Sequence, residues 1–282
     1  MDAVTDTIPT AIAVAPNGGR RTKLDHPALP LSPGELARTA AECLEAGAAM
    51  IHVHVRKADH THLLDADAYR SAISAIKTAI GDRLVMQITS EALGLYSPTE
   101  QDAMIRAVRP EAVSLALREL VPDAAHEPAF ADLLAWMRAE QVMPQIILYG
   151  TDEVIRLADM QRRGLIPFET IPVLYVLGRY TVGQTSKPGD LLPFLDADMP
   201  RFGHWSVCAF GRREAACVAA AALLGGHARV GFENNLHLPD GTLASSNADL
   251  IAAVRSIVQT SGLRLATAAD LRRQWTDGSL PR

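Results

Sequence analysis

The chain has 282 residues, of which 48% are hydrophobic and 21% charged, and its formal net charge is −5. These values are typical of a soluble globular protein with a large core, and single α/β barrels of this size are common. The negative charge gives no electrostatic reason to expect nucleic acid or an anionic membrane as a partner.

Cysteine content and apolar runs point to the same kind of protein. The three cysteines form no CxxC pair and lie in apolar contexts, so we expect buried free thiols of a reducing compartment. The first ten residues hold two aspartates and no apolar core, which predicts no signal peptide. The longest apolar stretch, residues 215–224, is too short to span a membrane. We therefore expect a cytoplasmic protein.

Short apolar segments recur along the whole chain and predict eight strands. Each is almost continuously apolar, as expected of parallel strands that are buried on both faces. The predicted strands cover residues 12–15, 50–55, 84–89, 112–116, 145–149, 171–177, 205–210 and 228–232.

Helix-start signals lie between these segments. Ser32 to Glu35 and Ser97 to Glu100 are capping boxes with proline at the first helical position. Further helices are predicted to start at Asp65 or Asp67, to run from Asp152 to about Gly164, and to cover residues 213–224, 247–260 and 267–275.

Eight β-then-α units without a linker predict one domain, residues 1–282, folded as a (β/α)8 TIM barrel with an extra C-terminal helix. The alternative is an open doubly wound sheet. Against it, the first βα turn, residues 16–20, lacks GxGxxG, and the chain has no GxxxxGK[ST] phosphate loop.

His52 and His54 lie two residues apart in the second predicted strand. Side chains at this spacing point to the same face, which is the geometry of a chelating pair for a divalent cation such as zinc. The alternative is a pair of hydrogen-bonded core histidines.

The active site of a TIM barrel lies at the C-terminal ends of its strands. Glu233 follows the eighth strand, so it forms a set of two histidines and one carboxylate with His52 and His54. Such a set leaves coordination positions open, as catalytic rather than structural sites do. Arg229 is predicted to point inward, where it needs an anionic partner.

Four other histidines are expected to lie away from this set. His204 and His227 begin the seventh and eighth strands and belong at the opposite rim of the barrel. We interpret His60 and His62, in the loop after the second strand, as solvated residues, with the alternative that a loop on the catalytic face reaches the site.

Several motifs together resemble one family. They are the HPALP segment that starts at His26, the HVHVR segment that starts at His52, and the RVGFENN segment that starts at Arg229. The sequence resembles the β-keto acid cleavage enzymes, whose founding member is the 3-keto-5-aminohexanoate cleavage enzyme. The matching segments span almost the whole chain, and the pair of HxHVR and RVGxE[DN]N in this order is specific.

The resemblance implies a zinc-dependent TIM barrel enzyme. It would convert a β-keto acid plus acetyl-CoA into acetoacetate plus a new acyl-CoA by Claisen and retro-Claisen chemistry. Zn2+ would be bound by His52, His54 and Glu233. Thr89 and Ser114 match hydroxyl residues that hold the acetoacetate moiety, and Arg229 matches an arginine that orients the catalytic acid.

The chain departs from the founding enzyme at two positions. Asn234 stands at the catalytic position of an aspartate proposed as the general base, and an amide cannot accept a proton at neutral pH. Either another group takes the proton or the reaction differs. Arg20 replaces an acid that meets the substrate's amino group, which favours an anionic distal end, as in a β-keto diacid. Alternatively, Arg20 binds a CoA phosphate or forms a surface ion pair. Asn17 and Ser90, at the ends of the first and third strands, are further candidates for substrate binding.

Two other functions stay open at this point. One is a zinc hydrolase of the amidohydrolase type, but that type needs further histidines on middle strands, and the fifth and sixth strands end in Tyr149 and Leu177. The other is a non-catalytic binding barrel. A homo-oligomer, either a dimer or a tetramer, is plausible because the helix over residues 213–224 is apolar nearly all round.

Overall fold

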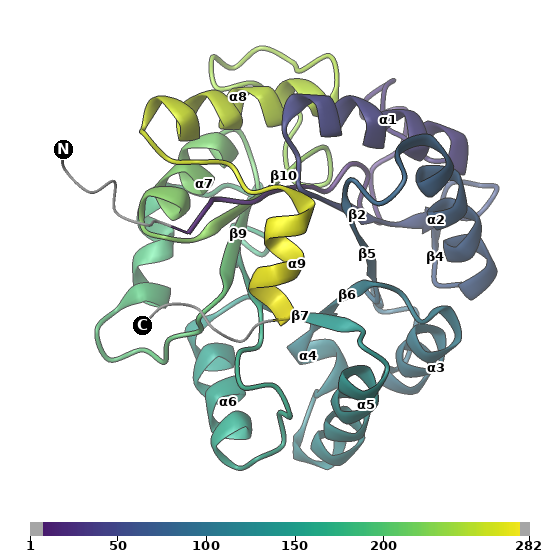
Figure 1. Cartoon of the computed structure of the whole chain (residues 1–282), viewed down its shortest axis with the longest axis vertical. Coiled ribbons are helices and arrows are strands. Elements are labelled where there is room, and N and C mark those ends of the chain that lie inside the picture. The colour runs from purple at the N-terminus through teal and green to yellow at the C-terminus, as the bar shows by residue number, and fades with distance from the viewer. Residues whose placement is uncertain (1–7, 277–282) are drawn as a thin grey trace.

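The structure, a computed structural model, describes residues 8–276 and has the TIM barrel fold (Figure 1). Eight parallel strands close on themselves in the order β1-β10-β9-β8-β7-β6-β5-β2. The predicted fold class is therefore confirmed. The barrel strands are β1 Ile12–Val14, β2 Met50–Val53, β5 Val85–Thr89, β6 Ala112–Ala116, β7 Met143–Leu148, β8 Val173–Leu177, β9 Trp205–Ala209 and β10 His227–Val230.

Helices surround the barrel, and both predicted capping boxes form, on α1 and α3. The extra C-terminal helix, α9 Ala268–Thr276, lies across the end of the barrel in Figure 1. The other helices are α1 Pro33–Ala46, α2 Ala66–Ile80, α3 Pro98–Val108, α4 Leu117–Leu120, α5 Glu127–Ala139, α6 Thr151–Arg162, α7 Glu214–Leu223 and α8 Asn247–Thr260, with a 3-10 turn η1 at Ala124–His126.

The sixth unit differs from the regular pattern. The segment after β8 forms the 3-10 helix η2, Pro188–Leu195, in place of an α-helix. Pro193 lies inside this segment, and proline removes a backbone donor and clashes with the preceding turn of an α-helix. The loop that joins β8 to η2, residues 178–187, lies at the mouth of the barrel.

Two predicted strands end two residues earlier than expected, and both of these ends lie at the mouth of the barrel. The strand predicted over residues 50–55 breaks at His54, and Val55–Arg56 forms β3, which pairs antiparallel with β4, His62–Leu63. The strand predicted over residues 228–232 ends at Val230, because Gly231 has a φ of +140° and starts a turn. His54 and Glu233 thus lie just past the ends of β2 and β10.

The interior confirms the expectation for the cysteines. All three cysteines, Cys43, Cys208 and Cys217, are buried free thiols. Across residues 8–276, no helix combines the length and the apolar character that crossing a bilayer requires.

Candidate metal centre and active site

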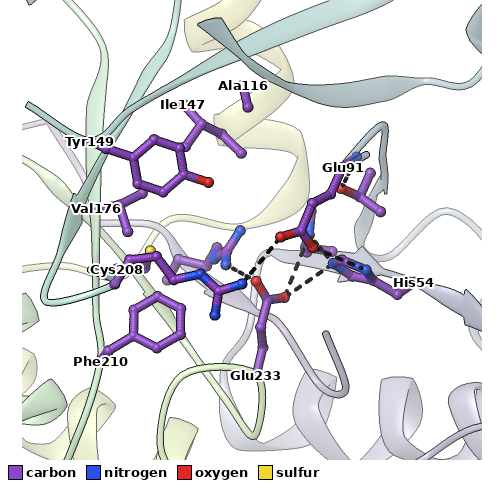
Figure 2. Close-up of a pocket in the computed structure, with 13 residues that line it drawn as sticks. His54, Glu91, Ala116, Ile147, Tyr149, Val176, Cys208, Phe210 and Glu233 are labelled. Atoms are coloured by element: carbon purple, nitrogen blue, oxygen red, sulfur yellow. Dashed lines mark hydrogen bonds and ion pairs between the residues drawn. The ribbon is translucent and has the colours of Figure 1, made fainter. Parts of the chain in front are cut away.

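Three polar groups converge at the mouth of the barrel (Figure 2). The Nε2 atoms of His52 and His54 lie 3.1 Å apart, and the Glu233 Oε2 atom is 3.7 Å from the first and 3.4 Å from the second. The buried Oε2 atom has no hydrogen-bond partner. An unpartnered carboxylate oxygen beside two imidazole nitrogens is the donor set that Zn2+ prefers, so these residues fit the expected metal.

Local backbone geometry places Glu233 in this cluster. The turn after β10 folds back on β1, where the Glu233 N–H donates to the Ala15 carbonyl at 3.1 Å. A Cβ atom at Gly231 would lie 2.4 Å from the same carbonyl oxygen, so glycine is required there both for space and for its positive φ. Gly18 is similarly close, since its Cβ would lie 2.6 Å from Glu233 Cγ.

A row of buried amides fixes the orientation of His52. Its Nδ1 atom contacts Gln87 Oε1 at 2.8 Å, and Gln87 Nε2 donates to Gln145 Oε1 at 3.0 Å. Because the Gln87 amide donates to Gln145, its oxygen faces His52 and accepts the Nδ1 proton. Burial, with the nearby Arg229 charge, lowers the pKa of His52 to about 3. The ring is therefore neutral, and Nε2 keeps a lone pair for a cation.

Arg229 is the buried partner of Glu233. Its Nη2 atom donates to Glu233 Oε1 at 2.5 Å, and the arginine side chain is 4% exposed. Burial alone raises the pKa of Glu233, but Arg229 and the two histidines outweigh it and hold that pKa well below its ordinary value. The pair confirms the expectation that Arg229 points inward, and it leaves only Oε2 free to face a metal.

A cavity opens beside the cluster, and its far wall is apolar (Figure 2). Strands β6 to β9 supply this wall. The cavity is lined by His52, His54, Thr89, Glu91, Ala116, Ile147, Tyr149, Val176, Arg179, Cys208, Phe210, Arg229 and Glu233. No histidine of the described residues from β7 and β8 lines it, which disfavours the alternative of an amidohydrolase-type centre.

Glu91 and Arg179 also line the cavity, and neither is among the predicted site residues. Glu91 lies with its Oε2 atom 3.9 Å from His54 Nδ1 and its Oε1 atom 3.4 Å from Arg179 Nη2. The Arg179 guanidinium also lies over the Phe210 ring, 4.9 Å from its centroid. A signal for Glu91 existed, because period-two alternation along β5 puts Glu91 on the same face as Thr89.

Of the predicted hydroxyl residues, Thr89 lines the cavity and Ser114 lies behind it. Thr89 Oγ1 accepts a hydrogen bond from the Glu91 N–H at 3.0 Å, and the Ser114 hydroxyl lies 3.5 Å away. Ser90, by contrast, donates to the Ser114 carbonyl and is fully buried. Ser114 and Ser90 thus contact neighbouring strands rather than the cavity.

The remaining predicted residues surround the site without lining the cavity. Asn17 is fully buried and donates to the carbonyls of Pro30 and His54, so it holds the end of β2 in place. Asn234 is also fully buried, and both its amide atoms lack partners. Arg20 is exposed at the rim of the barrel.

The histidines outside the cluster fall in different places. His204 and His227 stack on each other next to Trp275 of α9, at the opposite end of the barrel, as expected. The interpretation of His62 as a solvated residue is wrong. It is buried, and its Nε2 atom contacts the Glu91 carbonyl at 2.7 Å, because the β3–β4 hairpin folds it against the end of β5.

Known proteins are similar to this chain in sequence and in architecture. The family model described as "beta-keto acid cleavage enzyme" matches residues 9–275. The 3-keto-5-aminohexanoate cleavage enzyme of Fusobacterium nucleatum is 28% identical over 93% of this chain and 96% of its own length. The 3-oxoadipate:acetyl-CoA acetyltransferase of Cupriavidus necator is 27% identical, with 94% of each chain covered.

Among solved structures, a binary complex of ObcA with oxaloacetate superimposes with a TM-score of 0.70 at 18% identity, covering 88% of this chain and 67% of that one. At this identity the likeness supports the fold alone. The match over residues 9–275, together with the relatives that align over nearly their whole length, shows that the chain belongs to the β-keto acid cleavage enzyme family.

Proposed function

We propose that this protein exchanges acyl groups between a β-keto acid and acetyl-CoA, giving acetoacetate and a new acyl-CoA, with Zn2+ held by His52, His54 and Glu233. The observation that carries the proposal is the unpartnered Glu233 Oε2 atom, which faces two imidazole nitrogens beside a cavity. Zinc bound there would supply positive charge that stabilises the oxygen of an enolate.

The exchange needs a proton to be taken up and then returned. Removing a proton from C2 of the β-keto acid gives an enolate, which bonds to the acetyl carbon of acetyl-CoA and expels the CoA thiolate. The thiolate then attacks the original keto carbon, and the bond from that carbon to C2 breaks. The products are the new acyl-CoA and the enolate of acetoacetate, which takes the proton back.

We assign the proton transfer to Glu91. Among the described residues that line the cavity, it is the one carboxylate besides Glu233. Burial raises the pKa of Cys208 to about 11 and that of Tyr149 well above its ordinary value, so neither is ionised at neutral pH. Asn234 is an amide outside the cavity, and Glu91 would therefore do what Asn234 cannot.

Thr89 and Arg179 would bind the substrate. Because Thr89 Oγ1 already accepts a hydrogen bond from the Glu91 N–H, its own hydrogen is free to be donated to a substrate oxygen. The Ser114 hydroxyl contacts Thr89 Oγ1 from the side away from the cavity. Arg179 is the cavity cation not held by Glu233, so we assign it, rather than the exposed Arg20, to an anionic distal end of the substrate. A kinetic preference for an amino-β-keto acid over a β-keto diacid would contradict this assignment.

The direct test is an assay of zinc-loaded protein with acetyl-CoA and a panel of β-keto acids, in which acetoacetate is followed by mass spectrometry. We expect acetoacetate to form with at least one acid and to disappear in Glu233→Ala. If zinc is bound and no acid yields acetoacetate, the proposal is wrong and the non-catalytic binding barrel becomes the better interpretation. A cytoplasmic location and a dimeric or tetrameric state also stay predictions, and light scattering would test the oligomeric state.

A further inference from the structure

A second cavity lies next to the first at the mouth of the barrel. The loops after β8 and β9 contribute to both, because Arg179 and Phe210 line the first cavity whereas Thr181 and Arg212 line the second. In each loop, a single residue separates the residue that lines the first cavity from the residue that lines the second. The second cavity is lined by Thr181, Thr185, Ser186, Lys187, Asp190, Arg212 and Arg213.

Close packing of the two loops holds the cavities side by side. A Cβ atom at Gly178 would lie 2.6 Å from the Thr185 carbonyl oxygen, and one at Gly211 would lie 2.7 Å from the Gln184 carbonyl oxygen. Both glycines have positive φ, so the loops meet only because neither position carries a side chain. The Ser186 hydroxyl adds a bond across the loops by donating to the Phe210 carbonyl at 2.8 Å.

The second cavity is strongly cationic for a protein of net charge −5. Lys187, Arg212 and Arg213 contribute three positive charges, and Asp190 contributes one negative charge. The Asp190 carboxylate already accepts a hydrogen bond from the backbone N–H of Lys187 at 2.9 Å. Within residues 8–276, none of the three cations forms an ion pair with a carboxylate.

One pair of adjacent arginines elsewhere on the surface behaves differently. Arg162, the last residue of α6, and Arg163, which follows it, both pair with Asp159, and Arg163 also pairs with Glu127. Around the second cavity, Arg212 contacts His237 at 3.3 Å, but the three cations have no carboxylate partner within the described residues, so they match an anionic ligand with several phosphate oxygens.

We propose that the second cavity binds the phosphate groups of acetyl-CoA, so that the acetyl thioester extends into the first cavity. The inference rests on the proposed function, since that reaction needs acetyl-CoA. Acetyl-CoA carries its phosphates at one end and its thioester at the end of a long flexible arm. Tyr180 lies between the two cavities along the loop, with its ring 5.1 Å from that of Tyr149 in the first cavity. The arm would pass over this aromatic pair.

The test compares wild-type enzyme with Arg212→Ala/Arg213→Ala, both loaded with zinc. We expect the KM for acetyl-CoA to rise by about tenfold or more, because charge-assisted contacts to phosphate are lost. The KM for S-acetylpantetheine, which lacks the phosphates, and the KM for the β-keto acid are expected to stay unchanged. Arg162→Ala/Arg163→Ala is the matched control, since it removes an adjacent arginine pair on the outer helices and is expected to leave every KM unchanged.

Calorimetry with CoA and with adenosine 3′,5′-bisphosphate gives a second measurement that needs no activity. We expect both affinities to fall in Arg212→Ala/Arg213→Ala and not in the control. Unchanged affinities would overturn the inference even if the enzyme turns over. Arginine-dependent CoA binding in a protein that forms no acetoacetate would support the inference and contradict the proposed function instead.

Discussion

Two buried histidine pairs lie at opposite ends of the same barrel. At the mouth, the rings of His52 and His54 meet edge to face, with centroids 5.1 Å apart. At the other end, which α9 covers and which we call the closed end, His204 and His227 stack with centroids 4.2 Å apart. All four rings are almost completely buried, so burial alone does not distinguish a metal site from a structural core.

The difference lies in what each ring nitrogen faces. At the closed end, His204 Nε2 accepts a hydrogen bond from Trp275 at 3.1 Å, and His227 Nδ1 accepts one from the Ala11 N–H at 3.0 Å. At the mouth, both Nε2 atoms face a carboxylate oxygen that has no partner. Within the described residues, a group of three potential ligands forms at the mouth and not at the closed end. A nearby unsatisfied acid is thus what distinguishes the candidate ligand pair from the pair at the closed end.

Replacing a histidine at the mouth should have the largest effect. In His54→Ala we expect zinc to be lost and acetoacetate formation to fall by about 10³-fold or more, because the stabilisation of enolate charge amounts to several kcal/mol. Elemental analysis and the coupled assay measure the two effects. His204→Gln at the closed end is the control and should keep its zinc. Retention of zinc by His54→Ala would remove the distinction between the two pairs.

Glu91→Gln should produce the next largest effect and should leave zinc in place. We expect the exchange of C2 hydrogen of acetoacetate for deuterium in D2O to slow by about 10²–10⁴-fold, since a positioned general base contributes on this order. Nuclear magnetic resonance follows the exchange, with the rate in buffer subtracted.

Glu111→Gln makes the same chemical change at the N-terminal end of β6, where Glu111 pairs with Arg272, and its exchange rate should equal that of the wild type. If Glu91→Gln instead loses zinc and exchanges normally once zinc is restored, Glu91 positions His54 and is not the base. No exchange by the wild type itself would count against the proposed reaction as a whole.

The strand pattern carried most of what the sequence predicted correctly. Apolar runs located the barrel, and the i, i+2 spacing of His52 and His54 together with Glu233 after the last strand located the three residues that form the candidate metal site. The prediction was weakest just past the strand ends, where the chain leaves the pleat. The Gly231 turn buries Asn234 away from the cavity, and the β3–β4 hairpin buries His62. Neither direction follows from alternation along a strand.

The sequence also does not show how deep in the barrel a given side chain lies. Ser114 is paired in register with Thr89, yet only Thr89 lines the cavity, since Ala116 takes that place on β6. Arg179 could not be placed, because it belongs to a loop whose path depends on contacts with Gly211, 32 positions further along the chain. Tertiary packing, rather than local pattern, decides both cases.

At the closed end, burial of His227 should make the free energy of unfolding depend on pH. Burial lowers the pKa of His227 to about 4, below the value of 6.5 in an unfolded chain. Between these values the unfolded state binds a proton that the native state does not. The contribution of His227 to stability is therefore full above pH 6.5 and falls by about 3 kcal/mol as the pH drops to 4. Denaturant titrations of metal-free wild type and His227→Gln measure it.

The difference between those two proteins isolates His227 from other groups with an opposite trend. Burial raises the pKa of Glu214 to about 8, so its protonation favours the native state as pH falls. We expect the stability gap between wild type and His227→Gln to narrow below pH 6.5. A gap that stays constant from pH 7 to 4 would show that His227 takes up a proton in the native state as readily as in the unfolded state.

Trp275→Phe is expected to have the smallest effect, and it tests whether the closed end is purely structural. The substitution leaves the buried His204 Nε2 atom without its donor, which costs about 1–2 kcal/mol of unfolding free energy. Thermal denaturation measures this loss, and zinc content and turnover should not change, because Trp275 and the cavity lie at opposite ends of the barrel. A fall in zinc affinity would mean that the two ends are coupled through β9 and β10, since these strands join His204 and His227 to Cys208 and Arg229 in the cavity wall.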